Sequence, residues 1–125
     1  MLFRSGVQRV NDMDEFATAL IMFAQPHPVA DGGLVSIHDS GGERQLLIDL
    51  ADSMDVPLAR LGKGTTAELV TLLDPGLPAV NPLDAWGAGG LDADQVMEDC
   101  LAAMMKDTDA AMGAVIHDQI GRAHV

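Results

Sequence analysis

The sequence contains one cysteine, no tyrosine, three phenylalanines and one tryptophan among its 125 residues. Cys100 alone cannot form an internal disulfide framework, and such cysteine usage is typical of a reducing cytoplasm. Few aromatics mean that Leu, Val, Ile, Ala and Met must fill the core of what we expect to be one domain or a piece of one. No apolar run reaches the roughly 20 residues that a bilayer span needs, and the first residues lack the apolar segment of a secretory signal. We therefore expect a cytoplasmic protein without membrane contact.

Basic residues are scarce as well. The chain has 7 lysines and arginines against 19 aspartates and glutamates, a formal net charge of −12 at pH 7. Proteins that bind nucleic acid carry a basic footprint, so we predict no nucleic-acid partner. The average field would also repel polyanions such as ATP or coenzyme A. If the chain holds a phosphate group, we expect backbone N–H groups to bind it locally.

Apolar periodicity divides the chain into alternating helices and strands. The residues up to 10 form a lead-in, and Asp12 with Glu15 and Thr65 with Glu68 have the spacing of capping boxes. Alternating helices and strands indicate an α/β domain with a parallel sheet and right-handed crossovers. The predicted helices cover 12–25, 43–54, 65–73 and 92–106, the predicted strands cover 33–37, 56–61 and 112–117, and a long loop covers 75–91.

The turn Ser40-Gly41-Gly42 follows the first predicted strand and precedes a helix that begins at Glu43. A helix start after such a turn has unpaired backbone N–H groups, and the helix dipole there favours an anion. The same pattern also occurs in simple tight turns, and these residues alone leave that alternative open. The Gly62-Lys63-Gly64 segment lacks the spacing of a phosphate-binding loop, so we predict no such site there.

Two histidines are expected at ligand-binding positions. His38 and His117 fall at the carboxyl ends of predicted strands, the edge where open α/β sheets bind ligands. A structural, hydrogen-bonded role is the alternative for both, and no spacing of His, Cys or acidic residues indicates a metal. His27 lies between two prolines and is expected to be exposed. Cys100 is expected in the core and not as a nucleophile, because no basic group that would lower its pKa is evident nearby.

The long loop contains Asn81-Pro82-Leu83-Asp84 at its centre. Asn81 precedes a proline and is expected to be extended. Asp84 either caps a turn or holds a ligand group, and its residue type favours capping.

Five segments resemble the ADP-forming acyl-CoA synthetases, the acetate–CoA ligase family related to succinyl-CoA synthetase. The resemblance extends from residue 2 to about residue 118 and corresponds to the second flavodoxin-like ligase domain of that family. It implies a lead-in and joining helix at 1–30 and a partial, flavodoxin-like parallel sheet of about three strands with flanking helices at 31–119. The segments are Leu2-Phe3-Arg4-x-Gly6-Val7-x-Arg9-Val10, Asp14-Glu15-Phe16, Asp39-Ser40-Gly41-Gly42, Asp49-Leu50-Ala51 and Asn81-Pro82-Leu83-Asp84.

The family converts a carboxylic acid, CoA and ATP into acyl-CoA, ADP and phosphate through a phosphohistidine. By resemblance, Ser40, Gly41 and Gly42 form one of the two helix N-termini that bracket the phosphohistidine, with Asn81 and Asp84 in a neighbouring loop. The phosphohistidine segment is expected upstream of Met1, so no catalytic residue is assigned here. CoA and ATP with magnesium would be bound by the preceding CoA-binding and ligase domains and by an ATP-grasp domain. The fragment alone is expected to hold no cofactor and to be inactive.

Two other functions remain open or less favoured. Ligase-like regions of this kind also occur, by resemblance, in CoA-sensing protein acetyltransferases, where they bind ligands without completing the ligase cycle. A receiver-like phosphorylation domain would need an acidic cluster at the strand ends, which Asp39 alone does not provide. We also expect a non-native tail at 120–125, because the codons ATC GGA AGA GCA CAC GTC would encode it and resemble a sequencing-adaptor read.

Overall fold

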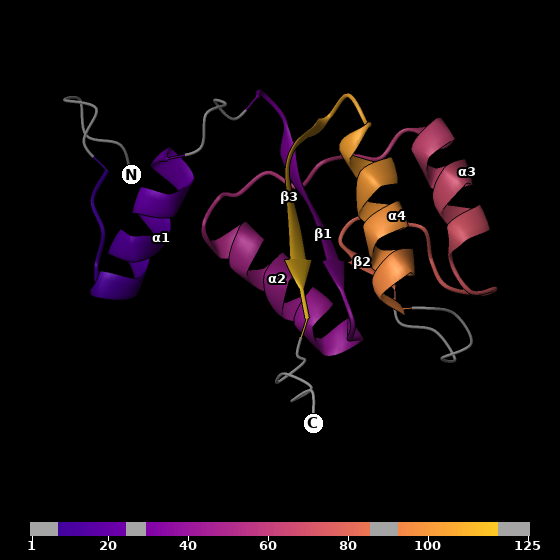
Figure 1. Ribbon diagram of the computed structural model, residues 1–125, viewed down its shortest axis with the longest axis horizontal. Coiled ribbons are helices and arrows are strands. Elements are labelled where there is room, and N and C mark those ends of the chain that lie inside the picture. The colour runs from indigo at the N-terminus through magenta and orange to yellow at the C-terminus, as the bar shows by residue number, and fades with distance from the viewer. Residues whose placement is uncertain (1–7, 25–29, 86–92, 118–125) are drawn as a thin grey trace.

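The computed structural model describes residues 8–24, 30–85 and 93–117 as an open α/β arrangement (Figure 1). Its sheet has the strand order β2-β1-β3, and both strand pairs are parallel. This confirms the predicted flavodoxin-like parallel sheet of three strands with flanking helices. In chain order the elements are α1 (Met13–Phe23), β1 (Gly33–His38), α2 (Gly41–Ser53), α3 (Lys63–Leu72), β2 (Leu83–Asp84), α4 (Ala93–Met105) and β3 (Ala110–Ile116).

The central strand β1 divides its side chains between two layers of helix. Successive side chains of a strand point to opposite faces. Val35 and Ile37 lie in the main apolar core, to which α3 and α4 contribute most of the other buried side chains. Ser36 and His38 lie on the opposite face, which α2 covers. That face is therefore the polar side of the sheet. The core residues from other elements are Ala59, Leu69, Leu73, Leu83, Met97, Cys100, Ala103 and Met104.

The strand predicted at 56–61 is wrong. Leu58 makes only an isolated parallel bridge to Leu34, with hydrogen bonds from Leu34 N–H to the Pro57 carbonyl (2.8 Å) and from Ala59 N–H to the Leu34 carbonyl (3.0 Å). Pro57 has no N–H to donate to a ladder, and α3 begins soon after the bridge. The second strand is instead β2, which lies within the loop predicted at 75–91, and residues 86–92 of that loop lie outside the described residues.

Helices α1 and α2 bury less than their apolar periodicity suggests. No residue of α1 is buried, and Phe16, Leu20 and Phe23 are all exposed. On α2, Ala51 is buried and Leu47 half-buried. The part of the sheet that the structure describes is narrow on that face, so it covers only a narrow stripe of α2 side chains. Ile48 is also half-buried, whereas Leu46, Leu50 and the C-cap residue Met54 are exposed.

Of the two predicted capping boxes, only the first is found in part. Asp12 caps α1 by accepting a hydrogen bond from Glu15 N–H at 2.8 Å, but the Glu15 carboxylate accepts from Asn11 N–H and not from Asp12. The Thr65–Glu68 box is wrong, because α3 begins at Lys63 after the N-cap residue Gly62. Both side chains have other partners: the Thr65 hydroxyl donates to Asp107.

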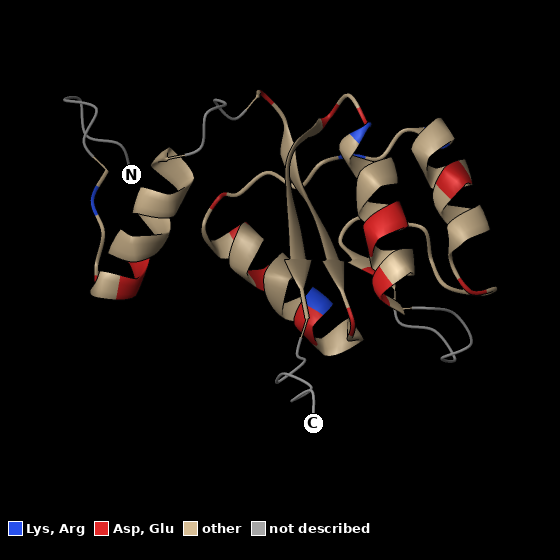
Figure 2. Ribbon diagram, in the orientation of Figure 1, with Lys and Arg blue, Asp and Glu red and all other residues tan. Residues whose placement is uncertain are grey.

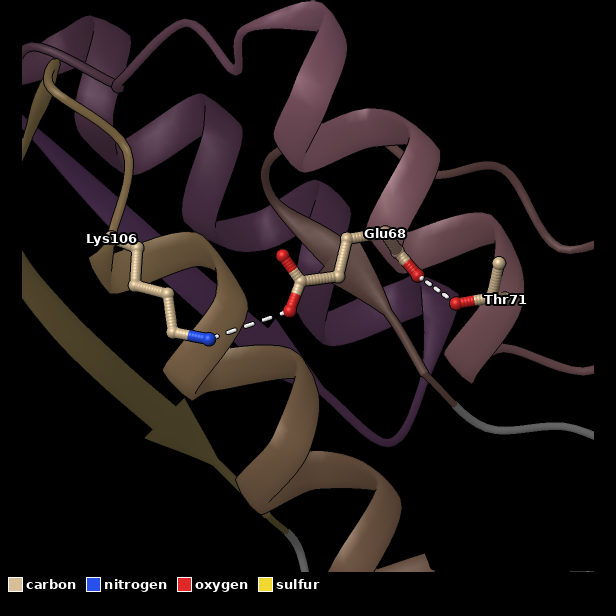
Figure 3. A network of polar contacts seen from close by, with 3 residues as sticks. All are labelled: Glu68, Thr71 and Lys106. Atoms are coloured by element: carbon tan, nitrogen blue, oxygen red, sulfur yellow. Dashed lines mark hydrogen bonds and ion pairs between the residues drawn. The ribbon is translucent and has the colours of Figure 1, made fainter.

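Glu68 instead pairs with Lys106, between α3 and the end of α4 (Figure 3). Glu68 Oε1 and Lys106 Nζ are 3.4 Å apart, and both side chains are well exposed. The Glu68 carbonyl also accepts a hydrogen bond from the Thr71 hydroxyl at 2.7 Å. Exposed ion pairs contribute little to stability, so the α3–α4 contact depends on the buried apolar residues.

Asp107 connects the loop before β3 to the start of α3. Its Oδ2 accepts hydrogen bonds from Gly62 N–H (2.7 Å) and from the Thr65 hydroxyl (2.6 Å), and its Oδ1 accepts from Asp109 N–H (3.2 Å). These bonds, the Thr65 bond first, hold the pKa of Asp107 below its ordinary value of 3.8. The ionised carboxylate thus acts as a cap for α3 that comes from a distant part of the chain.

We expect Asp107→Asn to lower stability near neutral pH and to remove part of its pH dependence. Because the folded-state pKa is depressed, the stabilisation is fully present above the unfolded-state value of 3.8 and is lost as the pH falls through the folded-state value. The difference from wild type should therefore be largest near about pH 7 and shrink below about pH 4. Urea unfolding followed by circular dichroism measures this. An equal loss at both ends of that range would contradict the assignment.

Candidate anion-binding site

Residues 40–42, which we call the glycine turn, form the N-terminus of α2 at the carboxyl end of β1. Ser40 is the N-cap residue, with extended backbone, and its Oγ accepts a hydrogen bond from Glu43 N–H at 3.2 Å. The first helical bond runs from Arg44 N–H to the Ser40 carbonyl at 3.1 Å. The helix therefore begins at Gly41, earlier than the predicted start at Glu43. The N–H groups of Gly41 and Gly42 belong to the first turn, where an α-helix supplies no partner.

The two glycines of this turn differ in their surroundings. A Cβ built on Gly42 meets only Ser40 Oγ, at 3.9 Å, whereas a Cβ built on Gly41 meets Asp84 Oδ2 at 3.2 Å. Gly42 is therefore open to a ligand, and the Asp84 carboxylate lies beside Gly41. The structure thus brings together two parts of the predicted site, the glycine turn and Asp84, that are distant in the sequence.

Asn81 lies beneath this site and completes the edge of the sheet. Its Oδ1 accepts a hydrogen bond from Ser36 N–H at 3.0 Å, and its Nδ2 donates to the carbonyls of Leu34 (2.8 Å) and Ala59 (2.9 Å). The amide therefore lies between the 57–59 segment and β2, where it takes the place of strand backbone. With its oxygen and nitrogen both bonded to backbone, Asn81 supports the edge that carries Asp84.

Arg44 is a site residue that the sequence reasoning missed. Its Nε donates a hydrogen bond of 2.6 Å to the Pro82 carbonyl, which ties the first part of α2 to the segment that ends in Asp84. Figure 2 shows basic and acidic ribbon segments close together near the start of α2. The helix dipole makes the N-terminus of a helix unfavourable for a cation. The sequence does contain a signal for Arg44 as a site residue: it is an arginine just after a Ser-Gly-Gly turn in a strongly acidic chain.

His38 is completely buried at the end of β1, on the face that α2 covers. Its Nε2 lies 3.0 Å from Ser36 Oγ, and its Nδ1 has no hydrogen-bond partner among the described residues. Burial lowers the pKa of His38 below 6.5, and the Arg44 charge lowers it further, while Asp84 and Asp39 oppose this shift. His38 is therefore neutral at pH 7.

The other histidine, His117, follows β3 and contacts the residue before the glycine turn. Its Nδ1 lies 3.0 Å from Asp39 Oδ2, and both side chains are largely buried. This contact joins the ends of β1 and β3, so the carboxyl ends of all three strands contribute a polar side chain to the same edge. Within the described residues, no group of three or more His, Cys, Asp or Glu side chains is arranged to hold a metal ion.

The remaining predicted residues lie away from this edge or outside the described part. Cys100 is buried in α4, and burial raises the pKa of its thiol to about 11, so the thiol stays neutral and is a poor nucleophile. His27, most of the 1–10 lead-in and the tail at 120–125 lie outside the described residues. No helix in the described part of the chain combines the length and apolar character needed to cross a bilayer.

Comparison with solved structures relates the fold to a much longer protein. No family model matches the chain, and no curated protein matches it significantly. The chain is similar to part of the crystal structure of PH0766 from Pyrococcus horikoshii OT3, with a TM-score of 0.76 and 25% sequence identity. The similarity covers 91% of this chain and 25% of that one, so the chain spans about a quarter of the length of PH0766.

Proposed function

We propose that this chain is a ligase domain of a cytoplasmic ADP-forming acyl-CoA synthetase and that its glycine turn binds the phosphoryl group of the phosphohistidine intermediate. The observation that carries the proposal is the open N-terminus of α2, at the carboxyl edge of a parallel sheet, where a Cβ built on Gly42 meets only Ser40 Oγ at 3.9 Å. The resemblance of the 39–42 and 81–84 segments to that family supports it. So does the place of both segments at one edge.

In this proposal the chain supplies charge stabilisation and not a nucleophile. The N–H groups of Gly41 and Gly42 would donate to phosphoryl oxygens, as an oxyanion hole does. The Arg44 guanidinium, fixed by Pro82, would supply the positive charge at this edge. The phosphorylated histidine would come from the preceding ligase domain, and CoA and ATP with magnesium would be bound by the other domains. Because this chain supplies one part of the site, it should be inactive alone.

The test is the substitution Gly42→Pro in a full-length synthetase that contains this domain. Proline is tolerated in the first turn of a helix but has no N–H, so it removes one donor and leaves the helix intact. We expect formation of the phosphoenzyme from ATP to fall by at least about 100-fold, the usual effect of losing one such donor. CoA binding should be unchanged. Phosphoenzyme is measured with radiolabelled ATP, and CoA binding by calorimetry.

Two variants serve as controls. Gly64→Pro makes the same change at the same position of α3, where nothing lies within 4 Å of the built Cβ, and should leave phosphoenzyme formation unchanged. Gly42→Ala keeps the N–H in an open position and should retain most of the activity. Equal phosphoenzyme formation by Gly42→Pro and Gly64→Pro would overturn the proposed role of the glycine turn.

A further inference from the structure

We propose that binding of a tetrahedral oxyanion at the glycine turn is coupled to protonation of His38, so that the site takes up one proton with its ligand. This inference rests on the proposed anion-binding function of the turn and adds to it how the site balances charge. The ligand class is a dianion such as a phosphoryl group or sulfate. In this proposal His38 does not contact the anion; it is a positioning residue whose positive charge, when protonated, favours the bound anion.

The position of His38 is unusual for a residue with only a structural role. It is completely buried at the carboxyl end of the central strand, directly before the segment that leads into the glycine turn. Its Nε2 is matched by Ser36 Oγ at 3.0 Å, but its Nδ1 is buried without a partner among the described residues. Buried polar atoms are nearly always hydrogen-bonded. An exception two residues before the N-cap residue of α2 points to a role in function.

The charged residues around His38 lie at the same edge of the sheet as the glycine turn. Asp84 at the end of β2 and Asp39 favour the protonated ring, whereas Arg44 on α2 opposes it. Glu43 lies in the first turn of α2, and His117 from β3 contacts Asp39. Helix α4 covers the other face of the sheet, where Val35 and Ile37 lie in the core.

A bound dianion would change this balance. It would lie beside Gly41 and therefore near the Asp84 carboxylate, whose Oδ2 is already 3.2 Å from the Cβ position of Gly41. Arg44 would supply one positive charge, whereas the ligand, Asp84 and Asp39 would all be negative. Adding a proton to His38 supplies a second positive charge without moving the backbone. Since His38 is neutral in the free protein near pH 7, it can take up this proton when the anion binds.

The test is a sulfate titration of the full chain followed by NMR. Sulfate stays a dianion between about pH 5.5 and about pH 8, so any change of its affinity over this range comes from the protein. The amide signals of Gly41 and Gly42 report binding, and the imidazole signals of His38 report its protonation. We expect binding to be up to about tenfold tighter at about pH 5.5 than at about pH 8, and the pKa of His38 to rise by about one when sulfate saturates the site, because linkage is reciprocal. Sodium chloride at equal ionic strength should reproduce neither effect.

Two variants separate the histidines. His38→Gln should bind sulfate with an affinity that no longer changes with pH, whereas His117→Gln should keep the pH dependence. If His38→Gln does not fold, the wild-type titration of His38 with and without sulfate decides the question. Equal affinity at both pH values with an unchanged His38 titration would overturn the coupling and leave the anion site standing. Unperturbed Gly41 and Gly42 amides at both pH values would overturn the anion site and the coupling together.

Discussion

Replacing Gly33 with alanine is expected to lower the free energy of unfolding by about 3 kcal/mol or more. A Cβ at Gly33 would lie 2.3 Å from Ala59 N and 2.6 Å from Leu58 C, which are backbone atoms. The 57–59 segment would have to move away from β1. That movement would break the hydrogen bonds that join Leu34 to Pro57 and Ala59. Urea unfolding followed by circular dichroism measures the loss.

Gly64→Ala is the matched control for Gly33→Ala. No atom lies within 4 Å of a Cβ built on Gly64, and the residue is in the first turn of α3. Alanine is a better helix former than glycine, so this change should raise the free energy of unfolding by up to about 1 kcal/mol. A Gly33→Ala variant that is as stable as Gly64→Ala would show that the 57–59 segment does not pack against Gly33.

Asn81→Ala should destabilise the protein by an amount similar to Gly33→Ala, about 3 kcal/mol. The substitution removes the partner of Ser36 N–H and two donors, those to the Leu34 and Ala59 carbonyls. An unsatisfied buried backbone group costs about 1–3 kcal/mol. Ser36 is completely buried, so water cannot replace the lost acceptor there without opening the sheet. Chemical unfolding and hydrogen exchange of the Ser36 amide measure the effect.

Asn81→Asp distinguishes a role in hydrogen bonding from a role in filling space. Aspartate has nearly the same shape and can still accept from Ser36 N–H, but its carboxylate would face the Leu34 and Ala59 carbonyls. Because that contact favours the protonated acid, the folded-state pKa of the new side chain should be raised. The deficit relative to wild type should therefore be largest above this folded-state pKa and shrink as the pH falls towards the unfolded-state value of about 3.9. An Asn81→Asp variant as stable as wild type at neutral pH would contradict the bonding assigned to the amide.

Both substitutions act on the edge of β1 that also supports the candidate site. The 57–59 segment pairs with the start of β1, β2 pairs with its end, and Asn81 fills the position between them. Asp84 is the second residue of β2, which is only two residues long, so the pairing of β2 with β1 fixes the position of Asp84. The stability of this edge and the position of the site therefore depend on the same few residues.

Much of the fold could be predicted from the spacing of apolar residues. The run 33–37 is short, apolar and β-branched, and it forms the central strand. Met97, Cys100 and Met104 share one helical face and are buried, as their spacing indicates. Alternation of such segments predicts the α/β class and the parallel sheet, and the Ser-Gly-Gly pattern predicts the start of α2 to within two residues.

Other features depended on contacts between distant parts of the chain. Thr65 has the local spacing of a capping box, but Asp107 binds it, because the loop before β3 reaches the start of α3. The 56–61 segment has the composition of a strand, yet the Asn81 side chain takes the next hydrogen-bonding position on β1, the N–H of Ser36. Local patterns contain no information on such competitors.

The sequence by itself determined the four helices and the strands β1 and β3, because each has an apolar pattern with a period of two or 3.6 residues along the chain. It also predicts that any anion is bound locally, since a chain with a net charge of −12 has few basic residues to form a broad basic surface. Only the tertiary structure decided that Arg44, Asp84, His38 and the glycine turn lie at one edge. The physical reason is that parallel strands bring their carboxyl ends together only after the crossovers between them have folded.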